Sequence, residues 1–232
     1  MAIRVLSAGA VQCMMEALGP EFETASGERL DIEFATVGAL RKRLEAGEEA
    51  DLVALSESAV AALNGSGRFV PGSVTNLGQS VTGVAVRTGA PNPDISTVDA
   101  FNRTLLAART VSHPDPKGGG SSGIYLAEYF KKAGLADAIG AKAVLGERGH
   151  DVAHLIAAGK AEIGMTFISE FLPVPGVTVV GPLPPGIECV NMYTAAIPAS
   201  SRQQAKAAAF LAALTDPATR GRWKAAGLDP AF

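Results

Sequence analysis

The sequence predicts an α/β fold with largely parallel sheets, because strand-like and helix-like segments alternate along it. Strand-like runs of apolar residues alternate along the whole chain with helix-like segments, whose apolar residues recur every three or four positions. This alternation is typical of parallel sheets, because a crossover helix returns the chain to the edge where the next strand begins. The 232 residues suffice for one large domain or two small ones with a proper core.

The elements of the first half follow one another as strand–helix pairs. Val11, Met14, Leu18 and Phe22 share one face of the first helix, and Gly47 marks the end of the second. In chain order, we expect a strand at 3–9, this first helix, a strand at 30–35, a helix at 38–47, a strand at 50–56, a helix at 57–67 and a long strand at 79–89.

The second half continues the alternation. Ser96 or Thr97 can cap its first helix, and Ile124, Leu126 and Tyr129 can pack one face of its second. In chain order, we expect a helix at 93–102, a strand at 109–113, a helix at 121–135, a helix, a glycine stop and a buried strand within 151–168, strands at 177–183 and 190–198, and helices at 202–214 and 217–227.

The composition argues against several classes of function. The chain is 47% hydrophobic and 19% charged, which is ordinary for a soluble globular protein. Its net charge of −3 leaves no basic footprint for nucleic acid. No apolar run approaches the roughly 18–20 residues that a membrane-spanning helix needs. We therefore expect no nucleic-acid partner and no membrane insertion.

The N-terminus and the two cysteines leave the compartment open between periplasm and cytoplasm. Residues 1–12 lack the basic cluster, the long apolar stretch and the cleavage site of a signal peptide. We expect a periplasmic protein if a signal peptide has been removed, and a cytoplasmic one otherwise. Cys13 and Cys189 are too few and too far apart for a disulfide framework or a metal motif. Both are interpreted as buried free thiols.

Small residues gather where the predicted strands end and helices begin. Ligand sites of α/β folds lie at such junctions, because helix N-termini there present unpaired N–H groups and a partial positive charge. The junctions fall at 7–10, 35–38, 118–123, 148–152 and 165–169. The first three consist largely of small residues with hydroxyl groups or bare amides, which favours an oxygen-rich anion held by neutral donors.

The segment GGGSSG at 118–123 can be read in two ways. Its backbone N–H groups can form an anion-binding nest, and its serines can cap the helix that follows. A flexible linker is the alternative. Lys117 precedes the segment and either adds a positive charge to the nest or is simply solvated. The segment lacks the Gly-Lys-Ser/Thr ending of a Walker loop, which argues against a nucleotide phosphate.

Five segments in this order resemble the periplasmic molybdate-binding proteins of ABC transporters. They are VLSAGAVQCMMEAL, IEFATVGALRKRLEAGEEADLVALS, HPDPKGGGSSGIYLAEYFKKAGL, VAHLIAAGKAEIGMTF and TDPATRGRWKAAGLDP. The resemblance implies the type II periplasmic-binding-protein fold, with a ligand cleft between two α/β lobes at 1–82 plus 196–232 and at 83–195. It also implies a small anionic ligand, an ABC permease as partner, a monomeric state and no cofactor.

The resemblance also implies a set of ligand-binding positions, and three of them depart from the family. The positions are Ser7, Gly9, Ala10, Thr36, Val37, Ser121, Ser122, Gly123, Val152 and Phe167. Ala10 and Val37 stand where the family has serines, and Phe167 stands where it has a tyrosine. Losing three hydrogen bonds to a desolvated dianion, at roughly 1.5–3 kcal/mol each, removes several decades of affinity. We therefore expect a larger, partly apolar anion in place of molybdate.

Two functions stay open at this point. The first is a solute-binding protein that holds a small oxyanion or an organic carboxylate. The second is an isomerase of a small di- or tricarboxylate, because aconitate isomerase resembles the same family and moves a proton along an allylic tricarboxylate. Such chemistry needs carboxylate-binding groups and one or two acid–base groups.

The candidate acid–base groups lie at or near the same junctions. His113, Lys117 and His150 are the candidate catalytic residues if the protein is an enzyme, and Tyr125 and Glu170 are further candidate bases. His150 and His154 can share a helix face, but no acidic pattern of the metalloprotease type accompanies them. We expect no metal site.

Overall fold

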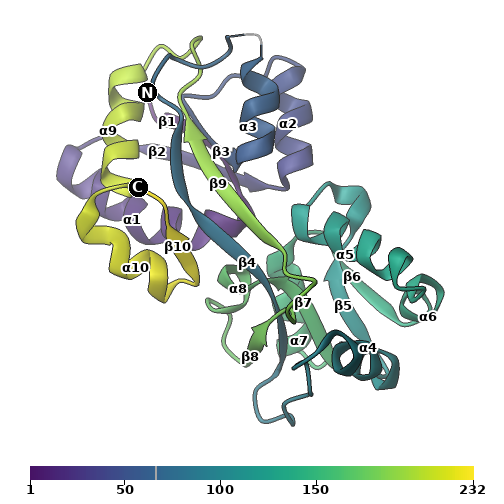
Figure 1. The fold of residues 1–232 in the computed structure, drawn as a ribbon. Coiled ribbons are helices and arrows are strands. Elements are labelled where there is room, and N and C mark those ends of the chain that lie inside the picture. Colours follow the sequence, from purple (N-terminus) through teal and green to yellow (C-terminus); the bar gives the residue numbers. More distant parts are fainter. Residues whose placement is uncertain (66) are drawn as a thin grey trace. The chain divides into compact units, whose positions relative to one another are not determined.

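The computed structural model describes residues 1–65 and 67–232, which divide into two compact units. Unit 1 comprises Met1–Ser80 and Asn191–Phe232, and unit 2 comprises Val81–Val190. The chain passes between the units within two strands, β4 (Thr75–Arg87) and β9 (Val190–Ala196) (Figure 1). The boundaries that the resemblance implied, 82/83 and 195/196, fall in the same two strands. The interpretation of the units as ligand-binding lobes stays a prediction.

Unit 1 contains three parallel strands. β1 (Ile3–Ala8) pairs in parallel with β2 (Leu30–Ala35) on one side and with β3 (Leu52–Ser56) on the other. β9 runs antiparallel to β3, and the short β10 (Leu228–Pro230) runs antiparallel to the start of β4. Because Ala8 pairs with Ala35, the carboxyl ends of β1 and β2 are level.

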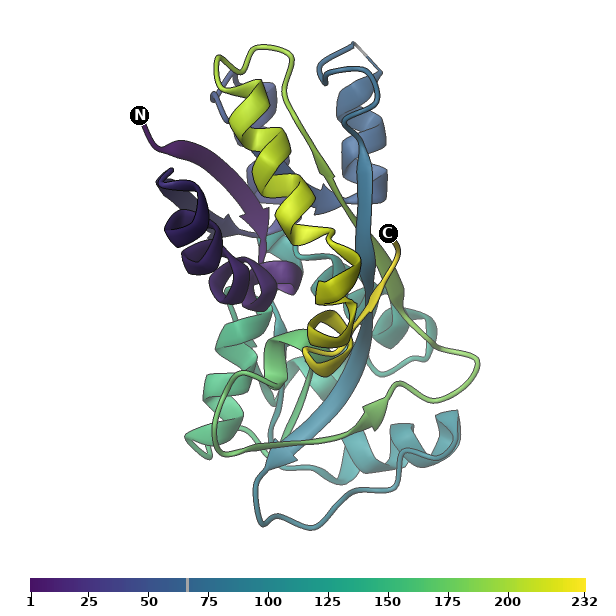
Figure 2. The same cartoon turned by 90° about the vertical axis from the view of Figure 1, so that its left-hand side faces the viewer.

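The helices of unit 1 cover both faces of these strands. Figures 1 and 2 show α2 and α3 on one side, and α1, α9 and α10 on the other. Phe22 of α1 packs against Phe210 of α9, with ring centroids 5.0 Å apart. The helical elements are the 3-10 turn η1 (Gly9–Val11), α1 (Gln12–Ser26), α2 (Val37–Glu45), α3 (Glu57–Asn64), α9 (Gln204–Leu214), η3 (Pro217–Thr219) and α10 (Arg220–Ala225).

Unit 2 repeats the parallel arrangement with different strands. β5 (Val111–Pro114) lies between β6 (Ala143–Gly146) and β7 (Ile163–Phe167), and both pairings are parallel. β4 runs antiparallel to β7 and to β8 (Val177–Pro182). Three carboxyl ends therefore lie at one edge of the unit 2 sheet, and a helical segment follows each.

Two apolar clusters fix the helices of unit 2. Phe101 and Leu126 belong to one cluster with Met165 of β7, whereas Val152 and Phe171 belong to the other with Ala85 of β4. The helical elements are α4 (Val98–Ala107), η2 (Pro116–Gly118), α5 (Ser121–Lys132), α6 (Ala136–Gly140), α7 (Gly149–Ala157) and α8 (Ile168–Phe171). The first cluster packs α4 and α5 against the sheet, and the second packs α7 and α8.

The structure confirms the alternation of strands and helices and corrects several details. Three short elements, α6, β6 and β10, were not expected. Cys189 is buried as expected, but Cys13 is only half-buried. In the part of the chain that the structure describes, no helix combines the length and the apolar character required to cross a bilayer.

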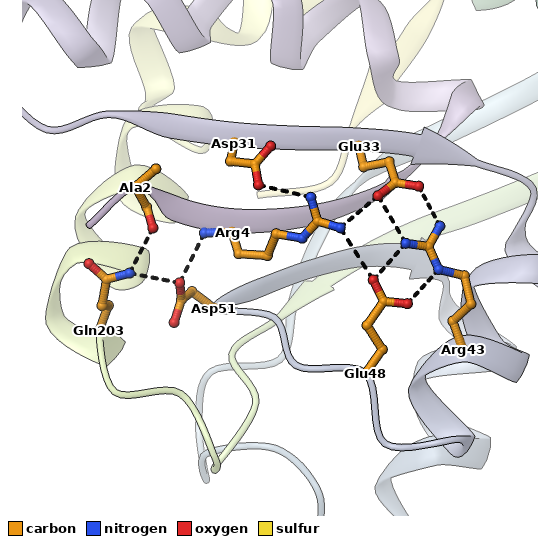
Figure 3. A network of polar contacts seen from close by, with 8 residues as sticks. All are labelled: Ala2, Arg4, Asp31, Glu33, Arg43, Glu48, Asp51 and Gln203. Carbon is orange, nitrogen blue, oxygen red and sulfur yellow. Dashed lines mark hydrogen bonds and ion pairs between the residues drawn. The ribbon is translucent and has the colours of Figure 1, made fainter.

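A network of arginines and acids joins β1, β2 and α2 in unit 1 (Figure 3). Glu33 accepts hydrogen bonds from Arg4 Nη2 at 2.6 Å and from Arg43 Nη1 at 2.5 Å. Glu48 accepts from Arg43 Nε at 2.5 Å. The hydrogen bond from Arg43 and a weaker one from Arg4 lower the pKa of Glu33 to about 2, against an opposing effect of burial.

We predict that Glu33→Gln lowers the free energy of unfolding in a pH-dependent way. The Glu33 side chain is 41% exposed, so solvent screening limits the loss at neutral pH to about 1 kcal/mol. A carboxyl whose pKa is depressed in the folded state stabilises above its unfolded pKa and loses this effect as pH falls through the folded value. The difference from the parent should therefore fade between about pH 4.5 and about pH 2.

Urea unfolding across this pH range measures the effect. Glu49→Gln is the control, because Glu49 is exposed and forms no ion pair with any of the described residues. A loss for Glu33→Gln that is the same at neutral and acidic pH would show that the ion pairs do not supply the stability.

Candidate functional site

The predicted ligand-binding residues of unit 1 lie at one edge of its parallel strands. Ser7 is fully buried near the end of β1, and its Oγ donates to the carbonyl oxygen of Ala8 at 3.2 Å. Gly9 and Ala10 form the 3-10 turn that follows. Thr36 Oγ1 accepts a hydrogen bond from the N–H of Ala39 at 3.2 Å. Thr36 therefore serves as the N-cap of α2, a role that its hydroxyl can perform without a ligand.

The predicted segment 118–123 of unit 2 ends at the start of α5. The N-cap of α5 is Gly120, which offers no side-chain hydrogen bond, so the expected capping by serines is wrong. The first backbone bond of the helix runs from the N–H of Ile124 to the carbonyl of Gly120 at 3.0 Å. The helix itself therefore gives no acceptor to the N–H groups of Ser121, Ser122 and Gly123.

The start of α5 is packed closely against the end of β5. A Cβ atom placed on Gly123 would lie 2.6 Å from the carbonyl oxygen of Pro114. Ser122 is buried and Ser121 is half-buried. Lys117 is exposed on η2, where Asp115 accepts a hydrogen bond from its backbone N–H.

Residues from the three strand–helix junctions of unit 2 meet at Thr166. Thr166 Oγ1 lies 3.4 Å from Ser122 Oγ of α5 and 2.5 Å from Oε2 of Glu170 in α8. A Cβ atom on Gly149, the first residue of α7, would lie 1.7 Å from Glu170 Oε2 and 2.3 Å from Thr166 Oγ1. Only glycine allows α7 to begin this close to the carboxyl group.

Glu170 is a buried acid with an unusual titration. Burial raises the pKa of Glu170 to about 7. Hydrogen bonds from Thr166 and from the backbone of Phe167 oppose this effect, as does the charge of Arg148, whereas Asp151 adds to it. Glu170 can therefore exchange a proton near neutral pH, a property typical of functional carboxyl groups.

The candidate catalytic histidines differ in their surroundings. His113 is 6% exposed, and its ring lies edge-on to Phe130 with centroids 5.5 Å apart. Desolvation lowers the pKa of His113. His150 is half-buried at the second position of α7, and its ring lies 4.8 Å from that of His154. The expected shared face of the two histidines is confirmed.

The remaining predicted residues contribute apolar side chains. Val152 belongs to the apolar cluster under α7, so only its backbone can contact a ligand. Phe167 is 3% exposed and is the N-cap of α8. Ala10 and Val37 are buried in unit 1. Tyr125 is half-buried, and burial raises its pKa. Within 1–65 and 67–232, no group of three or more histidines, cysteines or acids is arranged for a metal ion.

The sequence only partly identified this cluster. Ser122 was among the predicted ligand-binding residues and Glu170 among the candidate bases, but Thr166 and Gly149 were not singled out. The one available signal was an acid that follows a predicted buried strand, one residue beyond the predicted junction at 165–169.

We predict that Gly149→Ala destabilises the protein by about 1–3 kcal/mol, because the new methyl group overlaps a buried carboxyl that cannot retreat into solvent. Gly140→Ala in α6 is the matched control, since a Cβ atom there meets nothing within 4 Å. Thermal or urea unfolding of both variants measures the difference. Equal stability of Gly149→Ala and the parent would contradict the contact between α7 and Glu170.

Comparisons with known proteins place the chain in a family. The family of bacterial extracellular solute-binding proteins matches residues 3–229. An aconitate isomerase from Pseudomonas sp is 34% identical over 234 residues, which cover 98% of this chain and 87% of that protein.

Solved structures match along the whole chain. The periplasmic molybdate-binding protein of Azotobacter vinelandii has a TM-score of 0.79 at 18% identity, covering 99% of this chain and 100% of that one. The sulfate-binding protein of Mycobacterium tuberculosis has a TM-score of 0.76 at 19% identity, covering 100% of this chain and 88% of that one. The chain therefore belongs to the bacterial extracellular solute-binding protein family and has the mixed α/β fold of periplasmic binding proteins.

Proposed function

We propose that the protein is an isomerase of aconitate or of a closely similar tricarboxylate. The observation that carries this proposal is the 34% identity to an aconitate isomerase over 98% of the chain. The molybdate- and sulfate-binding proteins are 18% and 19% identical, and such a distance supports the fold but no choice of ligand.

The start of α5 is suited to bind one carboxylate of such a substrate. The N–H groups of Ser121, Ser122 and Gly123 have no acceptor within the helix, and the helix N-terminus adds a partial positive charge of roughly +0.5. Removing a proton next to the double bond delocalises negative charge onto the carboxylates. Fixed donors that face this charge lower the barrier. The unit 1 residues Ser7, Gly9, Ala10, Thr36 and Val37 stay predicted ligand-binding residues.

Among the three candidate catalytic residues, His150 has the best-suited surroundings. The reaction breaks one C–H bond, moves the double bond by one position and forms a C–H bond at the far carbon, so one group can accept and return the proton. His150 is half-buried beside Gly149, whereas His113 is packed against Phe130 and Lys117 is exposed. An imidazole can accept a proton at one ring nitrogen and return it, which suits both steps.

A second function is supported by the family itself. The match to solute-binding proteins covers residues 3–229, and structural neighbours bind molybdate or sulfate. A protein that binds an organic anion outside the cytoplasm and delivers it to an ABC permease, without turnover, fits these observations. Whether the protein converts its ligand into a product distinguishes the isomerase from the solute-binding protein.

We predict that the protein interconverts cis- and trans-aconitate, as followed by proton NMR. His150→Gln should slow this conversion by at least about 100-fold, the usual contribution of an acid–base group. His154→Gln is the matched control, because His154 lies on the same helix face but is exposed. If the parent binds aconitate without converting it, the solute-binding function replaces the isomerase. If both variants slow equally, His150 is not the acid–base group.

We predict that Ser121→Asp abolishes binding of carboxylates while the protein stays folded. An acid in the first turn stabilises a helix, but it places a negative charge among the N–H groups that would hold the ligand. A ligand at about 100 times its Kd stabilises the folded state by about 2.7 kcal/mol, which a thermal shift detects. The ligands are trans-aconitate, citrate and molybdate, and molybdate should give little or no shift.

The control for this variant is Ser200→Asp, which adds the same charge at an exposed position of unit 1. If carboxylates stabilise Ser121→Asp to the same extent as they stabilise the parent, residues 118–123 form only a turn. A molybdate shift larger than that of the carboxylates would favour an inorganic oxyanion as ligand.

A further inference from the structure

Three polar side chains form a buried series in unit 2. Glu170 Oε2 lies 2.5 Å from Thr166 Oγ1, which lies 3.4 Å from Ser122 Oγ. The three residues are 6%, 0% and 2% exposed. They come from α8, β7 and α5, and Ser122 carries one of the N–H groups proposed to bind a carboxylate. The series therefore connects a titratable group to the proposed binding position.

The protonation state of Glu170 decides which way this series donates. Each hydroxyl has a single proton to donate. If Glu170 is ionised, Thr166 donates to the carboxylate and Ser122 donates to Thr166. Ser122 then presents only oxygen lone pairs to its other neighbours. If Glu170 is protonated, it donates to Thr166 and Thr166 donates to Ser122. The hydroxyl proton of Ser122 is then free to donate to an anion.

The surroundings of Glu170 make both states accessible. The backbone N–H of Phe167 hydrogen-bonds to the carboxyl group and, with the charge of Arg148, favours the ionised form. Burial and the charge of Asp151 favour the neutral form, and Gly149 packs directly on the carboxyl group. The outcome is a pKa of about 7 for Glu170, against an ordinary value of 4.5.

We propose that Glu170 is a positioning residue that couples anion binding at the start of α5 to the uptake of one proton, through Thr166 and Ser122. This proposal rests on the proposed ligand position but not on turnover. Binding favours protonated Glu170 for two reasons. The protonated series donates to the ligand, and it removes a negative charge from the neighbourhood of an anion. Affinity therefore falls as pH rises through the titration of Glu170.

The test is calorimetric titration of trans-aconitate at about pH 6 and about pH 8.5. If only the form with protonated Glu170 binds the ligand, the affinity of the parent at about pH 8.5 is about 30-fold lower than at about pH 6. Uptake should then approach one proton per ligand bound, measured in two buffers of different ionisation heat. Glu170→Gln should keep its affinity at both pH values, because an amide N–H donates to Thr166 as the protonated acid does. Titration of trans-aconitate itself affects the parent and Glu170→Gln equally, so it does not contribute to the difference between them.

Two further variants separate the coupling from a purely structural role. Thr166→Val interrupts the series and should weaken the pH dependence although Glu170 is intact, because only the repulsion between the Glu170 charge and the anion then remains. Asp51→Asn neutralises a buried acid of unit 1 and should keep the parent's pH dependence. If Glu170 only caps α8 through the N–H of Phe167, Glu170→Gln lowers stability but leaves the pH dependence of binding unchanged, which would overturn the proposal.

The outcomes also distinguish this proposal from the proposed function. Binding that is proton-linked but without turnover contradicts the isomerase and supports the role of Glu170. Turnover with an affinity that depends equally on pH in the parent and in Glu170→Gln supports the isomerase and contradicts the coupling. If neither cis- nor trans-aconitate binds to the parent at either pH, both proposals are wrong.

Discussion

The parallel pairing of β5, β6 and β7 forces three helical segments of unit 2 to begin at one edge of its sheet. The first N–H groups of a helix lack partners inside that helix, so this edge gathers donors that something else must satisfy. Close packing then adds acceptors and hydroxyl groups to the same place. Gly149 brings the start of α7 against Glu170, and Gly123 brings the start of α5 against the end of β5. The polar cluster around Thr166 is the consequence of this topology.

Unit 1 has the same topology but satisfies its helix starts differently. Thr36 and Ser56 accept hydrogen bonds from the backbone of α2 and α3, so two of its junctions supply their own caps. The start of α5 in unit 2 has Gly120 at this position and receives no side-chain cap. An uncapped helix start in a closely packed environment is stabilised by any anion that enters it. This difference is the physical reason to assign the proposed carboxylate to the start of α5 before the starts of α2 and α3.

Long and strongly patterned elements could be predicted from the sequence, and short ones could not. The apolar spacing of Met14, Leu18 and Phe22 identified α1, and Thr97 caps α4 as one of two expected caps. The segments α6 and β6 have five and four residues, too few to show a period. The contact of Gly149 with Glu170 and the contact of Thr166 with Ser122 join residues distant in sequence, so local composition gave no sign of them. The burial of His113 against Phe130 likewise depends on the packing of α5, not on the strand that carries it.

A binding position made of neutral donors has an advantage and a limitation. Backbone N–H groups and hydroxyls hold an anion without a permanent countercharge, but they cannot accept or release protons near neutral pH. An exposed acid beside the ligand would repel it at every pH where both are ionised. A carboxyl buried behind two hydroxyls avoids this conflict, because burial keeps it neutral over much of the acidic range and the hydroxyls transmit its state. In the proposed coupling, Glu170 adds proton sensitivity to a binding position made of neutral groups. Holding a ligand does not require this sensitivity, but a protein that catalyses a proton transfer can use it.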